Sequence, residues 1–325
     1  MYINMMFLGL LVISAIVTMS ASSWFTAWMG LEVNLMMMIP LMANKHNKMS
    51  SEASMKYFMT QTMASSFLML GILILITPTI WNFNIWSSII IVSSLATKLG
   101  AAPFHFWLPS TMMNLTWLNC ILLMTWQKIA PLCLMMSSKI NLTTPIIVLS
   151  TFIGALGGFN QTNLKKILAY SSIGHIGWML TAMMINEDLL IMYFSLYSLM
   201  VSTMSLVFLS NNMTSSSSII QSSKTDNTNM FIFLNMLSLG GLPPFLGFLP
   251  KWLVIENIMF HYPMLSIFLI ITSLITLFYY VRLTYSSFLL INTPSILKMF
   301  QKSSPMNFIL TTPSILGLPS FMYLY

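Results

Sequence analysis

Runs of about 20 apolar residues, separated by short polar or proline-bearing breaks, recur along nearly the whole chain. Such a run spans a bilayer as one helix, and lipid leaves no backbone group unpaired, so the runs favour a bundle of membrane helices. The charge content agrees, because 6% of the residues are charged, against about 25% in a soluble domain. The pattern predicts an all-α polytopic membrane protein.

We expect about 11 transmembrane helices packed as a single domain over residues 1–325. Most lysines in the loops fall on one side when the loops alternate between the two sides. By the positive-inside rule this side is the cytoplasm or an organelle matrix, with the N-terminus there and the C-terminus opposite. The expected spans are 3–21, 24–43, 56–77, 87–107, 114–136, 145–161, 166–185, 189–209, 230–250, 262–290 and 306–324.

Several classes of function lack their sequence signals. The basic residues behind the net charge of +7 are dispersed and form no patch with aromatics, so nucleic acid is not an expected partner. Cys120 and Cys133 form no CxxC pair and have no histidine at ligand spacing, which gives no metal site. There is no GxGxxG, P-loop or serine nucleophile motif. The N-terminal apolar stretch is expected to be a first helix, because it lacks the pattern of an organellar presequence.

One stretch, LATKLGAAPFHFWLP from Leu95 to Pro109, breaks the rules for membrane helices. A lysine at the bilayer centre costs about 2.5 to 3.5 kcal/mol on insertion scales, and Lys98 lies in this position. Pro103 has no N–H and leaves a carbonyl one turn earlier without its helical partner. These features need protein or water beside them, so Lys98 is a candidate for an ion pathway.

A second stretch repeats the first. GAAPFHFWLP, from Gly100 to Pro109, aligns with GLPPFLGFLP, from Gly241 to Pro250, and Gly, Pro, Phe, Leu and Pro coincide. The two copies fall in the fourth and ninth spans, and the odd number of crossings between them predicts an inverted repeat. Paired, interrupted spans of this kind indicate a transport site near the midplane. The residues predicted to break the helices are Gly100, Pro103, Gly241, Pro243 and Pro244.

Five ionisable residues are expected inside the membrane: Glu32, Lys98, Lys128, His175 and Lys251. Glu32 lies mid-span and needs a cationic or hydrogen-bonding partner. Burial favours a neutral lysine, whereas a nearby carboxylate favours the charged form. Moving one charge can therefore change the protonation of its neighbour, which is the chemistry of a proton relay.

Each candidate also has a structural interpretation. Glu32, Lys98 and Lys128 could be buried ion-pairing groups, and Lys251 could extend from the end of its span to the interface. His175 and His105 could be satisfied packing residues. His105 is a secondary candidate, because the second copy has Leu246 in its place.

Five segments carry a resemblance to a known family: SEASMKYFMTQTMAS (51–65), TKLGAAPFHFWLP (97–109), LMTWQKIAPL (123–132), GGFNQTNLKKILAYSSIGHIGWML (157–180) and LSLGGLPPFLGFLPKW (237–252). With these segments the chain resembles the NADH dehydrogenase subunit 2 family of mitochondrial respiratory complex I, whose antiporter-like members are related to Mrp-type sodium/proton antiporters. This resemblance implies two inverted five-helix repeats, about 3–136 with a broken helix at 87–107 and about 145–290 with a broken helix at 230–250, followed by a terminal helix at 306–324. Larger members begin with three additional helices.

The resemblance also implies proton translocation driven by electron transfer from NADH to ubiquinone. Glu32 and Lys98 would form the pair of the first half, Lys128 the central relay and Lys251 the output lysine, with His175 near the counterpart position of Glu32. The counterpart of Lys128 is apolar, around Leu269, which leaves open whether each half moves a proton.

The same resemblance implies a cellular setting. The chain would bind no cofactor or metal and have no redox centre, since NADH, FMN, iron–sulfur clusters and ubiquinone would belong to other subunits. Its partners would be the lipid bilayer and the other membrane-arm and accessory subunits. The 33 methionines resemble those of invertebrate proteins encoded in AT-rich mitochondrial genomes, which implies the mitochondrial inner membrane with the N-terminus in the matrix and the C-terminus in the intermembrane space.

Two rival functions differ in class from a complex I subunit. One is a standalone cation/proton antiporter of the same fold, and the other is a membrane scaffold whose buried charges are structural.

Overall fold

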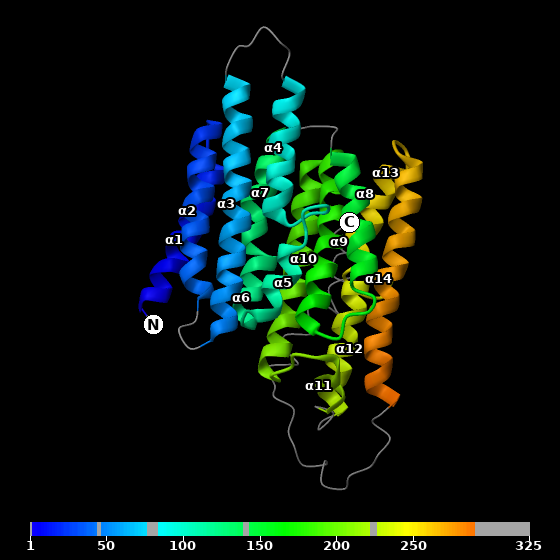
Figure 1. The fold of residues 1–325 in the computed structure, drawn as a ribbon. Coiled ribbons are helices and arrows are strands. Elements are labelled where there is room, and N and C mark those ends of the chain that lie inside the picture. Colours follow the sequence, from blue (N-terminus) through cyan, green and yellow to red (C-terminus); the bar gives the residue numbers. More distant parts are fainter. Residues whose placement is uncertain (1, 44–46, 77–83, 139–142, 222–225, 290–325) are drawn as a thin grey trace. The chain divides into compact units, whose positions relative to one another are not determined.

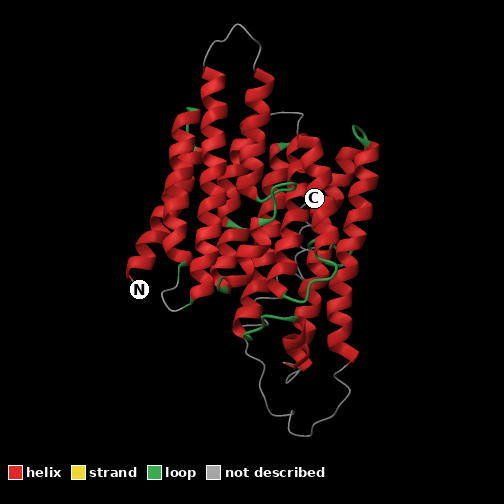
Figure 2. Cartoon of the chain, viewed as in Figure 1, coloured by secondary structure: helices red, strands yellow, loops and turns green. Residues whose placement is uncertain are grey.

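The computed structural model describes residues 2–43, 47–76, 84–138, 143–221 and 226–289. This part of the chain consists of helices and loops, with one isolated backbone bridge between Asn163 and Ser215 (Figure 2). The predicted helical class is therefore confirmed. The chain divides into two compact units, 1–149 and 150–325, and each unit is described below by itself.

Unit 1 is a bundle in which consecutive helices pack side by side. Helix α1 packs on α2, α2 on α3 and α3 on α4, while α7 returns to contact both α1 and α4 (Figure 1). Its helices are α1 (Tyr2–Met19), α2 (Trp24–Met42), α3 (Lys48–Ile76), α4 (Asn84–Leu99), α5 (Trp107–Asn114), α6 (Trp117–Met124) and α7 (Trp126–Ser138).

Unit 2 is a second bundle, and the division between the units falls within its first helix. Helix α9 packs on α10 and α13, and α12 packs on α10 and α14. Gly154 lies against α9, since a Cβ built there would be 2.5 Å from the backbone nitrogen of Gly174. The helices are α8 (Thr144–Gly157), α9 (Leu164–Ile185), α10 (Glu187–Ser210), α11 (Ser216–Gln221), α12 (Asp226–Gly240), α13 (Phe248–Met259) and α14 (Pro263–Leu289).

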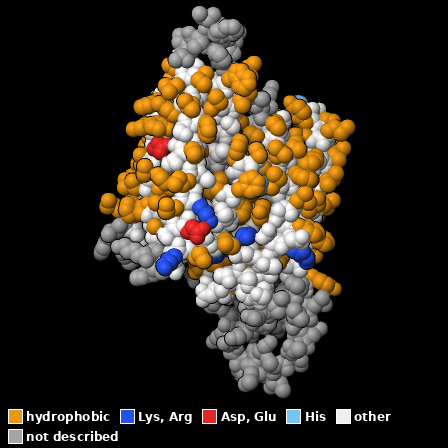
Figure 3. Space-filling model, in the orientation of Figure 1, with side chains coloured by type: hydrophobic (Ala, Val, Ile, Leu, Met, Phe, Trp, Pro, Cys, Tyr) orange, Lys and Arg blue, Asp and Glu red, His pale blue; other side chains and the backbone are white. Residues whose placement is uncertain are grey.

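Length and hydropathy make many of these helices suitable for crossing a bilayer. The predicted span 306–324 lies outside the described residues, so the count of 11 and the inverted arrangement stay predictions. Hydrophobic side chains cover most of the helical surface that Figure 3 shows. Six described stretches are long and apolar enough to cross a membrane: 24–42, 48–76, 117–137, 164–185, 187–210 and 263–285.

The two broken helices extend further along the chain than their expected bounds of 87–107 and 230–250. The first comprises α4, a break at 100–106 and α5, and the second comprises α12, a break at 241–247 and α13. Pro109 and Pro250 lower the local hydropathy, so the expected spans end near these prolines and not at the ends of the following helices. In the structure each proline is the third residue of the following helix, where its missing N–H removes no helical hydrogen bond.

Both helices before the breaks end in the same backbone motif. Gly100 has a φ of 76° and Gly241 a φ of 83°, a left-handed conformation that glycine adopts without steric cost. Ala101 N–H donates to the Ala96 carbonyl at 2.9 Å, and Gly100 N–H donates to the Thr97 carbonyl at 3.1 Å.

The second break reproduces these two bonds. Leu242 N–H donates to the Leu237 carbonyl at 3.4 Å, and Gly241 N–H donates to the Ser238 carbonyl at 3.0 Å. This pair of bonds is the Schellman motif, which ends a helix at a glycine. Each break therefore begins with a hydrogen-bonded helix end, and the glycine at that end is required by its conformation.

Candidate functional site

Lys98 lies in the last turn of α4, directly before the break, and 7% of its surface is exposed. Neutral side chains bind the carbonyls at this helix end. The Gln61 amide on α3 donates to the Lys98 carbonyl at 3.5 Å, and the Trp107 indole donates to the Thr97 carbonyl at 3.0 Å. The Lys98 ammonium is therefore not needed to cap its own helix.

Lys128 lies in the first turn of α7 and is 1% exposed. Its backbone N–H donates to the Thr125 carbonyl at 3.2 Å, where the chain turns between α6 and α7. Pro131 follows inside α7. Lys128 is therefore buried at a point where the expected single span 114–136 is divided into two helices.

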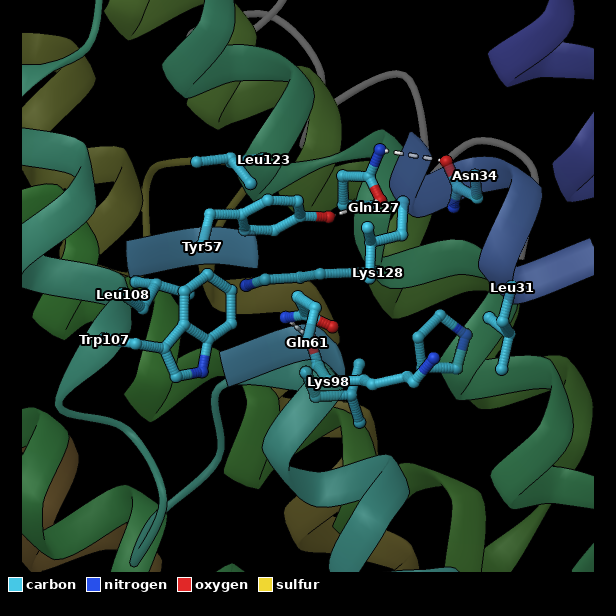
Figure 4. A pocket seen from close by; sticks show the side chains of 13 residues that line it. Leu31, Asn34, Tyr57, Gln61, Lys98, Trp107, Leu108, Leu123, Gln127 and Lys128 are labelled. Carbon is cyan, nitrogen blue, oxygen red and sulfur yellow. Dashed lines mark hydrogen bonds between the residues drawn. The ribbon is translucent and has the colours of Figure 1, made fainter. Parts of the chain in front are cut away.

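Lys98 and Lys128 line one cavity of unit 1 (Figure 4). The space open to water-sized spheres is about 20 Å³, and one water molecule needs about 10–15 Å³ and two or more polar partners. Figure 4 shows Gln61 between the two lysines, with Lys98 directed towards Leu31 and Lys128 towards Trp107. The cavity therefore brings together two of the predicted relay residues.

A chain of uncharged hydrogen bonds borders the same cavity. The Gln127 amide donates to the Asn34 side-chain oxygen at 3.0 Å, and the Tyr57 hydroxyl donates to the Gln127 side-chain oxygen at 3.4 Å (Figure 4). These three residues join α2, α3 and α7. They supply oxygens that can accept hydrogen bonds from an ammonium or a water molecule.

Glu32 on α2 is half-buried and does not line this cavity. Its carboxylate interacts electrostatically with Lys98. The direct ion pair among the described residues lies elsewhere, between Lys56 and Glu52. One carboxylate oxygen, Oε1, is buried without a hydrogen-bond partner in the described part of the chain. A buried, unsatisfied oxygen is costly, so this position is strained unless another donor meets it.

His105, the secondary candidate, lies in the first break and does not line the cavity of the two lysines. Its Nδ1 is 3.2 Å from the Pro103 carbonyl, and its ring packs on Phe106 with centroids 4.2 Å apart. These contacts are local to the break. They favour the packing interpretation of His105.

Lys251 lies in the first turn of α13 and is 6% exposed. Its ammonium donates to the Gly240 carbonyl at the end of α12, at 2.8 Å, and lies 6.0 Å from the ring centroid of Trp178. The side chain therefore points into unit 2, so the alternative in which Lys251 extends to the interface does not fit. Here the lysine itself caps the helix end.

His175 lies in the middle of α9 and is buried. A hydrogen bond of 2.9 Å joins its Nδ1 to the Tyr193 hydroxyl on α10, and the Tyr197 ring lies 5.0 Å from its ring. His175 and Lys251 line a common cavity of unit 2. The structure thus brings together the two predicted relay residues of this unit.

Sequence reasoning missed the uncharged members of both clusters. Asn34, Gln61 and Gln127 are polar residues in the middle of apolar helices, and the rule that identified the lysines applies to them too. The tyrosines of unit 2 carried no such signal, because tyrosine is common in apolar segments. Within the described residues, no group of three or more His, Cys, Asp or Glu side chains could hold a metal ion.

Lysines buried beside water-sized spaces, in bundles that also contain helices apolar enough to cross a bilayer, define a class of protein. It is a polytopic membrane protein with ionisable groups inside its helical bundles, a feature typical of ion and proton pathways.

Comparisons with known proteins give the family. Residues 21–276 match the family model described as NADH:quinone oxidoreductase/Mrp antiporter, TM. The chain is 49% identical over 301 residues to NADH-ubiquinone oxidoreductase chain 2 of Anopheles gambiae, covering 88% of this chain and 86% of the relative. It is 46% identical to the protein of the same name from Aedes aegypti, covering 88% and 86%. The chain belongs to the NADH:quinone oxidoreductase/Mrp antiporter transmembrane family.

A solved structure shares the fold. In respiratory complex I from Thermus thermophilus, one chain superposes with a TM-score of 0.84 at 21% identity, covering 98% of this chain and 78% of that chain. A chain of the Mrp complex from Dietzia sp. superposes with a TM-score of 0.73 at 17% identity, covering 84% and 58%. These two likenesses show a shared fold, and the family model over residues 21–276 confirms the predicted antiporter-like family.

Proposed function

We propose that the chain is a proton-translocating membrane subunit of NADH:ubiquinone oxidoreductase, respiratory complex I. The observation that carries the proposal is that Lys98 and Lys128, both buried, line one water-sized cavity. Membership of the family and the names of the relatives from Anopheles gambiae and Aedes aegypti support the assignment to this complex.

In unit 1 the relay comprises Glu32, Lys98 and Lys128. The negative charge of Glu32 attracts the Lys98 ammonium, since the two groups interact electrostatically. When that influence weakens, Lys98 releases a proton towards Lys128 across the cavity, where the Gln61 and Gln127 amides can hold the intervening hydrogen-bonded path. Two buried cations in one cavity repel each other, so a proton on one amine disfavours a second on the other.

In unit 2 the relay comprises His175 and Lys251. Both line one cavity, and both are hydrogen-bonded through a defined atom, Nδ1 of the histidine and Nζ of the lysine. Each group takes up and releases a proton without other covalent change. These hydrogen bonds fix the positions of the His175 ring and the Lys251 ammonium, and proton transfer requires positioned groups.

The subunit contributes a pathway for protons and takes no part in the oxidation of NADH. NADH, FMN, iron–sulfur clusters and ubiquinone belong to other subunits of the complex, and the energy released by electron transfer reaches this chain through its neighbours in the membrane arm. The chain lies in the mitochondrial inner membrane, with the N-terminus in the matrix and the C-terminus in the intermembrane space.

The test uses Lys98→Met and Lys251→Met chains in the assembled complex, reconstituted into vesicles. We expect NADH-driven proton uptake to fall by about 100-fold along the path from which the amine is removed. Loss of a general acid–base group typically has an effect of this size. Lys56→Met is the matched control, because Lys56 lies on α3 at the surface, paired with Glu52, and it should pump normally.

The same measurements separate the rival functions. Full pumping by an intact complex that lacks both Lys98 and Lys251 would favour a scaffold with structural charges. A purified chain that exchanges cations for protons in vesicles without the other subunits would favour a standalone antiporter.

A further inference from the structure

One face of α14 has a continuous apolar stripe that ends at an arginine. Its residues follow one another at spacings of three and four residues, which places them on one side of a helix. More than half of each apolar side chain is exposed. The stripe comprises Met264, Ile267, Ile271, Leu274 and Phe278, and the exposed Arg282 follows it.

The length of the stripe places Arg282 at the level of lipid headgroups. From Met264 to Arg282 the helix rises about 27 Å, at about 1.5 Å per residue, and the hydrocarbon core of a bilayer is about 30 Å thick. The stretch 263–285 is long and apolar enough to cross a membrane. A guanidinium at this position therefore meets phosphate groups, while the stripe meets acyl chains.

The Arg282 guanidinium is held in place by Phe159, in the turn after α8. Its Nη2 donates to the Phe159 carbonyl, and its Cζ lies 5.5 Å from the centroid of the Phe159 ring. That ring stacks on Phe278 of the stripe, with centroids 5.4 Å apart and planes inclined by 11°. A guanidinium has several N–H donors, so this positioned group still has donors for an acceptor outside the chain.

The charges at this end of unit 2 favour an anionic acceptor. The Phe159 carbonyl is neutral, and the ion pair found among the described residues joins Lys56 to Glu52 in unit 1. A short loop leads from Phe159 to Lys165 and Lys166 in the first turn of α9, which add two positive charges. A guanidinium binds phosphate through paired hydrogen bonds, and basic groups at a membrane surface attract anionic lipids.

We propose that Arg282, held by the stacked rings of Phe159 and Phe278, binds the phosphate of an anionic phospholipid whose acyl chain lies along the stripe of α14. Such a lipid has its phosphate and its acyl chain in the order in which this face presents the arginine and the stripe. Arg282 lines neither of the two lysine cavities. The site is therefore a lipid-binding surface separate from the proposed proton path.

The first test is a density map of the assembled complex that contains this chain, prepared with phosphatidylglycerol. We expect headgroup density within hydrogen-bond distance of the Arg282 guanidinium, continuing as an acyl chain beside Phe278 and Leu274. A compact density without a chain would mean a free anion, and a carboxylate of a neighbouring subunit on Arg282 would mean a protein contact. Either result, or no density at all, would overturn the proposal.

The second test counts the phosphatidylglycerol molecules that the complex retains after delipidation and addition of this lipid. We expect Arg282→Gln to retain one molecule fewer than the unmodified complex, because the guanidinium and its charge are lost. Lys56→Gln is the matched control, since it removes an exposed charge of unit 1 that is paired with Glu52, and it should retain the full number. Equal retention by Arg282→Gln and the unmodified complex would contradict the site.

Phosphatidylcholine, added back in place of phosphatidylglycerol, tests the preference for an anionic headgroup. We expect Arg282→Gln and the unmodified complex to retain equal numbers of this zwitterionic lipid. A difference as large as that found with phosphatidylglycerol would overturn the assignment to an anionic lipid. The density map uses the unmodified chain, so it decides the proposal even if Arg282→Gln does not assemble, and neither test depends on whether the chain moves protons.

Discussion

The two helix breaks share a backbone and differ in the position of their lysine. In both, a glycine with positive φ ends the first helix through the same pair of hydrogen bonds. In unit 1 neutral Gln61 and Trp107 satisfy the last carbonyls, and Lys98 faces the cavity. In unit 2 the Lys251 ammonium satisfies the last carbonyl itself. The same backbone motif therefore occurs with a lysine that does not bind the helix end, Lys98, and with a lysine whose ammonium stabilises the helix end, Lys251.

The largest effect is expected from Gly247→Ala, which tests how tightly the second break is packed. A Cβ on Gly247 would lie 1.8 Å from the Ser238 carbonyl oxygen, and backbone atoms cannot yield as a flexible side chain does. We expect no assembled chain in the complex, measured by immunoblot of the purified assembly. Gly9→Ala is the control, because a Cβ there has nothing within 4 Å; normal assembly of Gly247→Ala would contradict the packing described.

The next largest effect separates the two lysines by stability. Lys251→Met leaves the Gly240 carbonyl without its donor, whereas Lys98→Met leaves the Gln61 and Trp107 bonds intact. We expect Lys251→Met to be less stable than Lys98→Met by about 1–3 kcal/mol, the cost of a buried acceptor left unsatisfied. Thermal denaturation of the assembled complex measures it, and equal stability of the two variants would remove the distinction between the breaks.

A smaller effect is expected from Gln61→Met, which removes the neutral donor of the first break. The Lys98 carbonyl loses its hydrogen bond, at a cost of about 0.5–1.5 kcal/mol, and the cavity loses an amide between the two lysines. We expect slower NADH-driven proton uptake with nearly normal assembly. Ser65→Ala is the control on the same helix, since its hydroxyl donates to the Thr62 carbonyl one turn away.

The smallest effect is expected from Glu52→Gln, which breaks the surface ion pair with Lys56. The two side chains are 46% and 53% exposed, and an exposed pair four residues apart on a helix contributes about 0.3–0.5 kcal/mol. We expect no change in proton uptake and a shift in denaturation temperature near the limit of measurement. A large loss of pumping would mean that charges outside the cavities also belong to the path.

The sequence was sufficient for the helical class and for the position of both breaks. Apolar length locates most of the helices, because a bilayer demands it. The recurrence of glycine and proline identified Gly100 and Gly241, whose left-handed conformations follow from the helix ends they form. The ends of the broken helices were less predictable, since Pro109 and Pro250 reduce hydropathy while starting new helices.

The partners within the sites were beyond the reach of the sequence. The bond between Tyr57 and Gln127 joins residues 70 positions apart, and that between Asn34 and Gln127 joins residues 93 positions apart. Such pairs depend on how helices pack, which a single sequence does not specify. The same holds for Lys251, whose expected place at the end of a span gave no indication that it would bind the Gly240 carbonyl.

The glycine-ended helices have an electrostatic consequence. A helix presents the equivalent of about half a negative charge at its C-terminus, from carbonyl dipoles that point the same way. The chain has only 6 Asp and Glu residues, and none of the buried side chains in its described part is acidic. The ends of α4 and α12 therefore add negative potential next to Lys98 and Lys251, and at Lys98 this potential adds to that of the half-buried Glu32 carboxylate. The field of the helix ends does not titrate, so it attracts cations at every pH.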